Sequence, residues 1–347
     1  MTRATTSPPS SPRAPAPPRG RGGFDARTLV GGRADARLLL GRGLPLFALV
    51  VLFVVCAVLQ PGVLTLSGLA LLLSPAVPLV LASVSQMVII TLGDIDLGNG
   101  ALVGLVTAVV AVYLVDRPLL AVALLVGIGA LYVGQALLVQ LRGIPSIIVT
   151  LGASFVWLGT GLALLPIPGG TVPAWLSGLM NLTTPETENY VLPVPMAVVF
   201  AAAIGLLAWF LLIRLPYGAV IRAVGSNPAA VRRGGWSVLR ARMAGYAIAA
   251  GFAILAGIAL AGQISAGDAT TTANYTLLAV AAVILGGGQF SGGRAVPFGA
   301  VFGAFAISLV ASMLSFLDVP SSYQSAVQGL VLVLVLAGRI LTDRGTT

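Results

Sequence analysis

Residues 119–141 read LLAVALLVGIGALYVGQALLVQL, a run of 23 residues without a charged side chain. A transmembrane helix needs about 20 largely apolar residues to cross the hydrocarbon core of a bilayer. Asp116-Arg117-Pro118 precedes the run and Arg142-Gly143-Ile144-Pro145 follows it, so charged and helix-breaking residues mark both of its ends. This stretch predicts a membrane-spanning helix.

Most of the chain has the same character. Of its 347 residues 58% are hydrophobic and 8% are charged, and its mean hydropathy is +1.03. A soluble domain carries about 25% charged residues, far more than this chain has. The sequence therefore predicts an all-α, polytopic integral membrane protein of about ten transmembrane helices, with little room for a soluble domain.

Polar breaks between the apolar runs place these ten spans. They are expected at residues 44–59, 77–92, 101–115, 119–141, 146–165, 193–213, 243–264, 275–285, 295–314 and 323–340. The short apolar stretch 64–73 is expected to be interfacial or re-entrant, because two prolines follow it. Residues 1–43, rich in Pro, Ser, Gly and Arg, are expected to form a disordered basic tail. Residues 44–341 would form the transmembrane domain, and residues 342–347 a short C-terminal end.

The ionisable residues argue against an enzyme. All 19 basic residues are Arg, and the chain has no His and a single Cys, Cys56. Without His the chain lacks the commonest acid–base group and metal ligand, and one Cys cannot form an intrachain disulfide. We expect no catalytic site, no metal and no cofactor bound by this chain. A basic chain suggests nucleic acid in a soluble protein, but here the Arg residues lie at the ends of apolar runs, which topology explains.

Arg placement also predicts the orientation. Cytoplasmic loops of membrane proteins are enriched in Lys and Arg. Ten crossings with both termini in the cytoplasm leave only Arg117 outside, and the cytoplasmic side then holds Arg142, the Arg-rich loop 214–242, Arg294, Arg339 and Arg344.

The loop 214–242 is the most informative segment. Asn227 is suited to cap a helix that Pro228 begins, and glycines that follow it are suited to end it. A short helix here would dock into a partner protein, or the loop would only fix topology; both remain open. The residues expected to take part are Gly225, Asn227, Pro228, Ala229, Ala230, Arg232, Arg233 and Gly235.

Two further breaks interrupt the apolar pattern, at residues 93–100 and 286–294. Charged groups at membrane depth usually line water or pair with another group. By the expected topology, however, the first break lies near the cytoplasmic edge, where carboxylates are solvated, so a structural role such as helix capping by Asp96 is favoured. The glycines of the second break suit close helix packing rather than phosphate binding, because no Lys-Ser/Thr follows them. The candidate residues for the translocation path or a helix break are Asp94, Asp96, Gln86, Asn274, Gly286, Gly287 and Gln289.

Three stretches resemble motifs of bacterial ABC importer permeases of the monosaccharide (ribose/xylose/galactose) type, which are related to branched-chain amino acid permeases. Residues 90–98 (ITLGDIDLG) resemble that family's Gly-x-Ile-Asp-Leu-Ser-x-Gly segment. Residues 223–238 resemble its Gly-Asn-Pro-Glu-Ala-Ala-x-x-Ser-Gly-Ile loop, and residues 275–294 resemble its Tyr-Glu-Leu-x-Ala-Ile-Ala-Ala-Val-Val-Leu-Gly-Gly segment. The order and spacing match over about residues 44–339, although Ala229, Thr276 and Leu278 stand where acidic residues are common.

The resemblance implies partners on other chains. Such permeases dimerise and form a translocation path for a small-molecule substrate in the bacterial plasma (inner) membrane. ATPase subunits dock at the loop around residues 223–236 and bind the ATP, and an extracytoplasmic binding protein delivers the solute. The function expected is therefore the permease subunit of an ABC importer, most simply for a monosaccharide. The alternatives are a permease for branched-chain amino acids or nucleosides, an ion-coupled secondary carrier, and a membrane anchor without transport.

Overall fold

The computed structural model describes residues 32–181, 195–320, 323–324, 326–327 and 329–330. The chain divides into two compact units, Met1–Leu40 and Gly41–Thr347. Of the first unit only the beginning of one helix is described, so the architecture below is that of the second.

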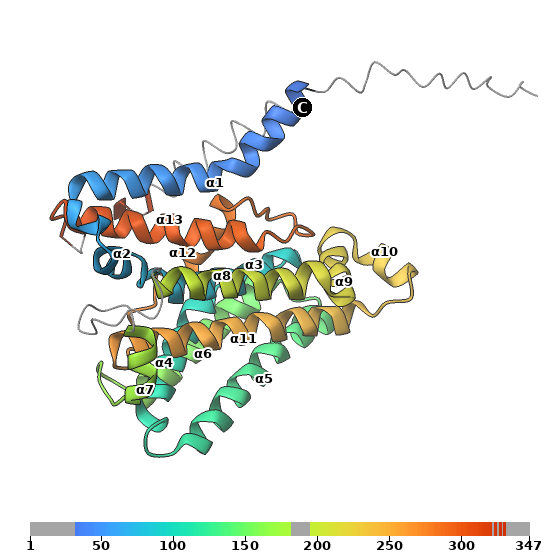
Figure 1. Ribbon diagram of the computed structural model, residues 1–347. Coiled ribbons are helices and arrows are strands. Elements are labelled where there is room, and N and C mark those ends of the chain that lie inside the picture. The colour runs from blue at the N-terminus through green and yellow to red at the C-terminus, as the bar shows by residue number, and fades with distance from the viewer. Residues whose placement is uncertain (1–31, 182–194, 321–322, 325, 328, 331–347) are drawn as a thin grey trace, which may run out of the picture. The chain divides into compact units, whose positions relative to one another are not determined.

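The described part of the second unit is helical throughout, apart from connecting turns and one isolated bridge between Gly169 and Gly267 (Figure 1). The helices in chain order are α1 (Gly32–Leu59), η2 (Pro61–Leu64), α2 (Leu66–Leu73), α3 (Ala76–Thr91), α4 (Asn99–Tyr113), α5 (Pro118–Arg142), α6 (Ser146–Leu164), α7 (Ala174–Asn181), α8 (Met196–Trp209), η3 (Phe210–Arg214), α9 (Pro216–Ser226), α10 (Pro228–Arg233), α11 (Val238–Ile264), α12 (Tyr275–Leu285) and α13 (Pro297–Phe316).

Five of these segments are long and apolar enough to cross a membrane: α5, α6, α8 with η3, α11 and α13. The pair α2 and α3, bent by 40°, forms a sixth span if the pair is counted as one. The prediction of an all-α polytopic membrane protein is confirmed. The number ten stays a prediction. The expected spans at 44–59, 101–115 and 275–285 correspond to shorter apolar helices, Leu46–Leu59, Asn99–Tyr113 and Tyr275–Leu285. The expected last span at residues 323–340 lies mostly outside the described residues.

Three expectations about non-helical segments are corrected. Helix α1 begins at Gly32, so residues 32–43 are helical rather than disordered; good helix formers such as Ala and Leu precede the apolar run. Helix α7 lies between the expected spans at residues 146–165 and 193–213, where no helix was expected, because its apolar residues pack on α11, with Leu176 buried. Within the loop 214–242, the segment before Asn227 is an additional helix, α9. Residues 1–31 and 342–347 lie outside the described part.

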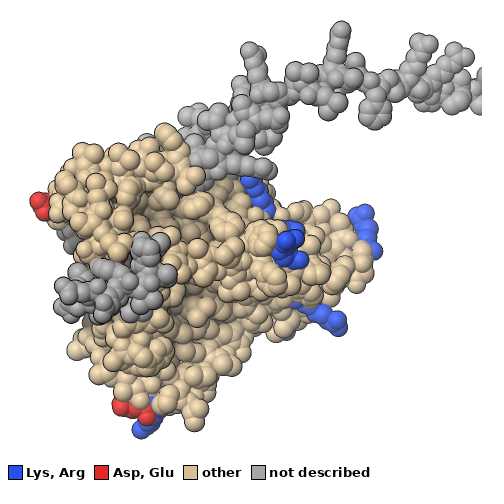
Figure 2. All heavy atoms as spheres, in the orientation of Figure 1, with Lys and Arg blue, Asp and Glu red and all other residues tan. Residues whose placement is uncertain are grey.

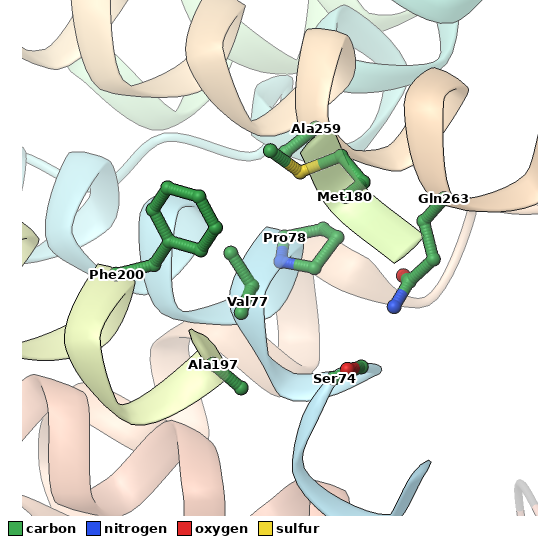
Figure 3. Close-up of a pocket in the computed structure, with 8 residues that line it drawn as sticks. All are labelled: Ser74, Val77, Pro78, Met180, Ala197, Phe200, Ala259 and Gln263. Atoms are coloured by element: carbon green, nitrogen blue, oxygen red, sulfur yellow. The ribbon is translucent and has the colours of Figure 1, made fainter. Parts of the chain in front are cut away.

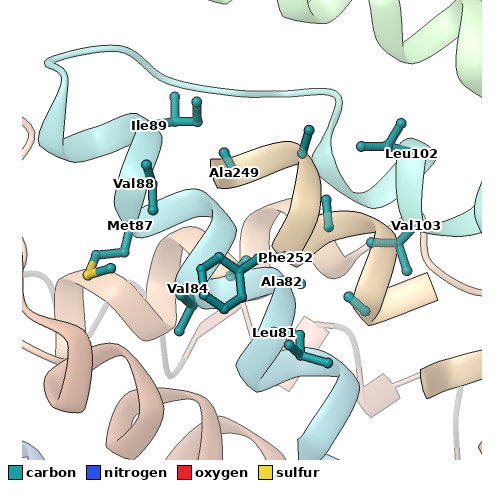
Figure 4. Close-up of a cluster of buried hydrophobic side chains, with 14 of the residues drawn as sticks. Leu81, Ala82, Val84, Met87, Val88, Ile89, Leu102, Val103, Ala249 and Phe252 are labelled. Carbon is teal, nitrogen blue, oxygen red and sulfur yellow. The ribbon is translucent and has the colours of Figure 1, made fainter. Parts of the chain in front are cut away.

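Helix α3 lies at the centre of the unit. All of its residues are buried, as expected for a predominantly apolar helix that is surrounded by other helices. Figure 4 shows Val84 of α3 beside Phe252 of α11, with Leu102 of α4 elsewhere in the same cluster of buried side chains. This packing holds α3 against the neighbouring helices, and the break at residues 92–98 follows its last residue, Thr91.

Candidate functional site at a glycine junction

Helices α9 and α10 form a helical hairpin in the segment expected to dock a partner. The side-chain oxygen of Asn227 accepts the backbone N–H of Ala230 at 3.0 Å, and Pro228 is the first residue of α10. The predicted cap and helix start are both present. The side chain of Val231 is buried, while Arg232 and Arg233 in the last turn are exposed.

The end of the hairpin is fixed to its beginning. Gly235 has a φ of +78° and ends the turn after α10. The ring of Trp236 then packs edge-on against that of Tyr217, near the start of α9, with centroids 6.0 Å apart. The hairpin therefore presents an arginine-tipped helix, α10, held on a second helix, α9.

The C-terminal end of α9 meets the ends of two other segments, backbone against backbone. A Cβ atom added to Gly225 would collide with the carbonyl oxygen of Thr91, the last residue of α3, and would lie 2.5 Å from the N–H nitrogen of Gly293. Gly293 itself donates this N–H to Thr91 O at 2.8 Å. We call the site formed by Thr91, Gly93, Gly225, Gly292 and Gly293 the glycine junction.

The other residues of the glycine junction are equally close. A Cβ on Gly292 would lie 2.8 Å from Gly93 Cα and 2.9 Å from Gly225 O. Gly292 and Gly293 also have φ angles of +77° and +79°, which favour glycine. The junction thus joins, through backbone contacts, the three motifs that the sequence singled out separately: the break after α3, the loop around α9–α10 and the glycine-rich segment after α12.

Asp94, in the break, binds the beginning of α11. Arg242 Nη1 donates to Asp94 Oδ2 at 2.8 Å and to Oδ1 at 2.9 Å, and Tyr246 OH donates to Oδ2 at 3.3 Å. The Asp94 side chain is buried. The expectation that this carboxylate is solvated at a membrane edge is therefore wrong, because α11 covers it with a paired cation.

Asp96 is also buried, and it binds α5 and the start of α4. Tyr132 OH donates to Asp96 Oδ2 at 2.5 Å, and the Gly98 N–H donates to Oδ1 at 2.6 Å. Gly98, not Asp96, is the residue at the cap position of α4. Asp96 binds the N–H of Gly98 and so orients the start of the helix from two residues before it. The expectation of a solvated carboxylate is wrong for Asp96 as well, since only 1% of the residue is exposed.

The other candidate path residues do not gather at one place. Gln86 is buried in α3, where its Oε1 accepts from Asn99 Nδ2 at 3.5 Å. Asn274 is exposed and precedes α12. Gly286 packs against Gly299 of α13, and Gly287 and Gln289 lie in the turn after α12, Gln289 being exposed. These residues therefore do not form one site with the glycine junction.

Sequence reasoning missed several partners in the site. Arg242, Tyr246 and Tyr132 bind the two carboxylates, and Ser226 lies against Gly293. A signal for Arg242 existed, because a charge inside the first turns of an apolar helix needs a partner. The tyrosines carry no such signal, since aromatic residues are common in apolar spans. Among the described residues, no group of three or more His, Cys, Asp or Glu could hold a metal ion.

Two cavities differ in their capacity for a solute. A crevice where α3, α7, α8 and α11 meet is bordered by Ser74, Phe200 and Gln263 (Figure 3). Its volume is about 10 Å³, room for roughly one water molecule. A hollow of about 500 Å³ opens between η2, α2 and the C-terminal end of α13, lined partly by hydroxyl and amide groups. It lies at the end of α13 that is remote from the glycine junction.

Charges are separated between the two ends of the helices. In Figure 2 the blue Arg side chains gather mainly on the side where α9 and α10 lie, and the red carboxylates in view lie on the opposite side. This separation is the one that the predicted orientation requires. Which end faces the cytoplasm stays a prediction.

Comparisons with known proteins agree with this architecture. A family model described as branched-chain amino acid transport system / permease component matches residues 68–336. The chain is 35% identical to the autoinducer 2 import system permease protein LsrC of Enterobacter sp. (strain 638), over 87% of this chain and 88% of the relative. It is 29% identical to the ribose import permease protein RbsC of Escherichia coli (strain K12), over 89% and 97% of the two chains, and 31% identical to that of Bacillus subtilis (strain 168), over 86% and 92%.

No solved structure matches the chain. The match to the family model covers most of the chain, including the break after α3, the α9–α10 hairpin and the glycine-rich segment. The chain therefore belongs to the family of branched-chain amino acid transport system permease components and is a multi-pass membrane transport protein of the monosaccharide ABC permease type, not an enzyme.

Proposed function

We propose that this chain is the translocating subunit of an ABC importer in the bacterial inner membrane, for a monosaccharide or a closely similar neutral polar solute. It pairs with a second permease subunit, most simply another copy. An ATPase subunit docks on α10 from the cytoplasm, and an extracytoplasmic binding protein delivers the solute to the other face. The relatives named for ribose and autoinducer 2 import support this choice.

The glycine junction is the observation that carries the proposal. Helix α10 is short, tipped with Arg232 and Arg233, and exposed, which suits docking on an acidic partner surface. Helix α9 connects it to Thr91 and Gly293 with no side chain between the backbones. A displacement of α10 by a closing ATPase would therefore reach the end of α3 and the glycine-rich segment between α12 and α13 directly.

The same contacts weigh against an ion-coupled carrier. Such carriers move protons or ions through groups that change their charge or coordination. Asp94 is held by Arg242 and Tyr246, and Asp96 by Tyr132 and the start of α4. Both carboxylates thus have fixed structural partners.

Uptake into proteoliposomes tests the proposal. The chain is reconstituted with its cognate ATPase and binding protein, and uptake of labelled D-ribose and L-leucine is measured with ATP or with an imposed ion gradient. We expect D-ribose uptake only with ATP and both partners. Uptake driven by an ion gradient without the ATPase would contradict an ABC permease, and ATP-driven uptake of L-leucine alone would contradict the sugar assignment.

A further inference from the structure

The structure points to a second functional surface, remote from the glycine junction, in the polar segment that joins α11 to α12. We propose that residues 268–274 form a wall of the translocation path at mid-depth in the membrane and present hydroxyl and amide groups to a neutral polar solute. This inference rests on the proposed transport function and assigns a location for the path.

The segment lies along α4, not in a loop outside the membrane. Thr107 Oγ1 of α4 donates to the carbonyl oxygen of Asp268 at 3.0 Å and accepts its N–H at 3.0 Å. Further along, Thr272 Oγ1 donates to Gly100 O at 2.8 Å, and Gly100 N–H donates to Thr276 Oγ1 at 2.8 Å. The segment therefore runs antiparallel to α4 over seven residues, a length of about 10 Å.

Small residues of α4 make room for this approach. A Cβ on Gly104 would lie 2.5 Å from Ala269 O and 2.7 Å from Thr272 Oγ1. A Cβ on Gly100 would lie 2.5 Å from Thr272 O. Two glycines, four residues apart on one face of α4, thus accept the backbone of an irregular segment in a shallow groove.

Contacts with α3 place this groove inside the membrane. Asn99, the first residue of α4, donates from Nδ2 to Ala82 O at 2.9 Å. Ala82 lies near the middle of α3, nine residues before Thr91 at the glycine junction, or about 13 Å along the helix axis. The proposed docking of the ATPase on α10 puts the glycine junction at the cytoplasmic edge of the hydrocarbon core. Since this core is about 30 Å thick, we infer that Gly100 and Thr272 lie near its middle.

The outer edge of the segment is polar and exposed on this chain. Thr270, Thr271, Ala273 and Asn274 are exposed, whereas Ala269 and Thr272 are buried against α4. Lipid-exposed irregular backbone does not occur in the hydrocarbon region, and such segments are found where they are covered by protein or line a water-filled cavity. An edge of hydroxyl and amide groups fits the second case.

The chemistry of this edge selects neutral solutes. The carboxylate of Asp268 accepts the N–H and hydroxyl groups of both Thr270 and Thr271, so it closes a turn and does not stand free. Residues 265–293 contain no Arg that would bind an anionic group. The Thr270 and Thr271 hydroxyl oxygens, whose hydrogens go to Asp268, remain acceptors for the hydroxyl groups of a polyhydroxylated solute. The segment itself supplies no cation to a carboxylate-bearing solute.

Thiol labelling of the membrane-embedded complex with its ATPase tests the location. In a Cys56→Ala background, single variants Thr271→Cys and Asn274→Cys are treated with a charged, membrane-impermeant methanethiosulfonate. Val126→Cys, on the exposed apolar side of α5, is the lipid-facing control, and Asp116→Cys in the α4–α5 turn is the water-exposed control. Because the thiolate is the reactive form and needs water, we expect residues 271 and 274 to react at least about tenfold faster than residue 126.

Labelling of residues 271 and 274 at the rate of residue 126, in a complex that transports D-ribose with ATP, would overturn the inference and leave the proposed function intact. Rapid labelling in a complex without ATP-driven uptake of any tested solute would instead contradict the proposed function. Covalent labelling of Thr271→Cys should also lower D-ribose uptake, while labelling of Asp116→Cys should leave it unchanged. Undiminished uptake after complete labelling of residue 271 would count against the segment as a wall of the path.

Discussion

Arg242 on α11 and Asp94 in the break after α3 form an ion pair, with 2.8 Å between Nη1 and Oδ2. Both side chains are largely buried, with 13% and 8% of their surfaces exposed. Helix α11 follows α10 after a short turn, so this pair is a second connection between the proposed docking helix and the break after α3. The first connection is the glycine junction.

Removal of one partner should destabilise the chain strongly. Breaking a buried ion pair leaves an uncompensated charge, at a cost of about 3–5 kcal/mol. We expect Asp94→Asn to lower the midpoint of thermal unfolding in detergent clearly, and Arg242→Gln to do the same. The exposed control Arg240→Gln should leave the midpoint nearly unchanged.

The double variant Asp94→Asn/Arg242→Gln distinguishes the interaction between the two side chains from the effect of replacing each one alone. It leaves no unpaired charge, so its loss should be smaller than the sum of the two single losses, with a coupling of about 1–3 kcal/mol. Strictly additive losses would show that Asp94 and Arg242 do not interact as the structure describes.

Tyr132→Phe removes the hydroxyl that binds Asp96 and changes nothing else in its outline. An unsatisfied buried acceptor costs about 1–3 kcal/mol, more when it is charged. We therefore expect a lower unfolding midpoint for Tyr132→Phe than for the control Tyr217→Phe, whose ring is partly exposed. Equal midpoints for the two variants would mean that the Tyr132 hydroxyl contributes nothing to the fold.

Charge reversal on α10 should weaken binding of the ATPase without disturbing the membrane domain. Arg232→Glu/Arg233→Glu changes two exposed side chains that make no intramolecular ion pair in the described part of the chain. We expect weaker co-purification of the ATPase, most evident at low salt, because exposed charges are screened as ionic strength rises. Arg117→Glu, in the α4–α5 turn, is the control. Undiminished ATPase binding in the double variant would exclude α10 as the docking element.

The predicted orientation places two loops on opposite sides of the membrane. Between Gly170 and Gly234 lies the span formed by α8 and η3, along with the short helices α7, α9 and α10. Reporters of sidedness inserted after Gly170 and after Gly234 should report the periplasm and the cytoplasm respectively. Both reporters on one side of the membrane would contradict the predicted topology.

Much of the fold could be predicted because lipid as solvent imposes a simple rule: backbone groups must bond within the helix. The expected span at residues 146–165 differs from α6 by one residue, and that at 275–285 coincides with α12. Helix α7 could not be predicted this way. Eight residues after a Pro- and Gly-rich stretch become helical because Leu176 and Met180 pack against Gly262 of α11, a tertiary contact that no local pattern reveals.

The candidate site was predicted in parts and not as a whole. Asn227 and Pro228 carry strong local signals, and the structure has the cap and helix that they indicate. The sequence predicted close packing for the glycines of the break at residues 286–294, but it placed Gly93 in a separate break and Gly225 in a loop. Their meeting depends on how α3, α9 and the segment between α12 and α13 pack. The solvation of Asp94 was wrongly predicted for a related reason, since distance along the chain from a span end does not reveal a cation supplied by another helix.

Gly225→Ala, compared with Gly251→Ala, tests most directly whether α9 transmits the movement of the ATPase. Alanine at position 225 would force Thr91 and Gly293 apart, whereas nothing lies within 4 Å of a Cβ at Gly251 in α11. Alanine at position 251 should be neutral or add up to about 1 kcal/mol to helix stability.

The decisive measurement is ATP hydrolysis and D-ribose uptake in the same proteoliposomes, with chain insertion and ATPase binding verified for each variant. We expect Gly251→Ala to match the natural chain. Gly225→Ala should bind and hydrolyse ATP through its partner but import D-ribose at least about tenfold more slowly, a loss of 1.4 kcal/mol or more in coupling. Uptake by Gly225→Ala at the rate of the natural chain would contradict transmission through the glycine junction.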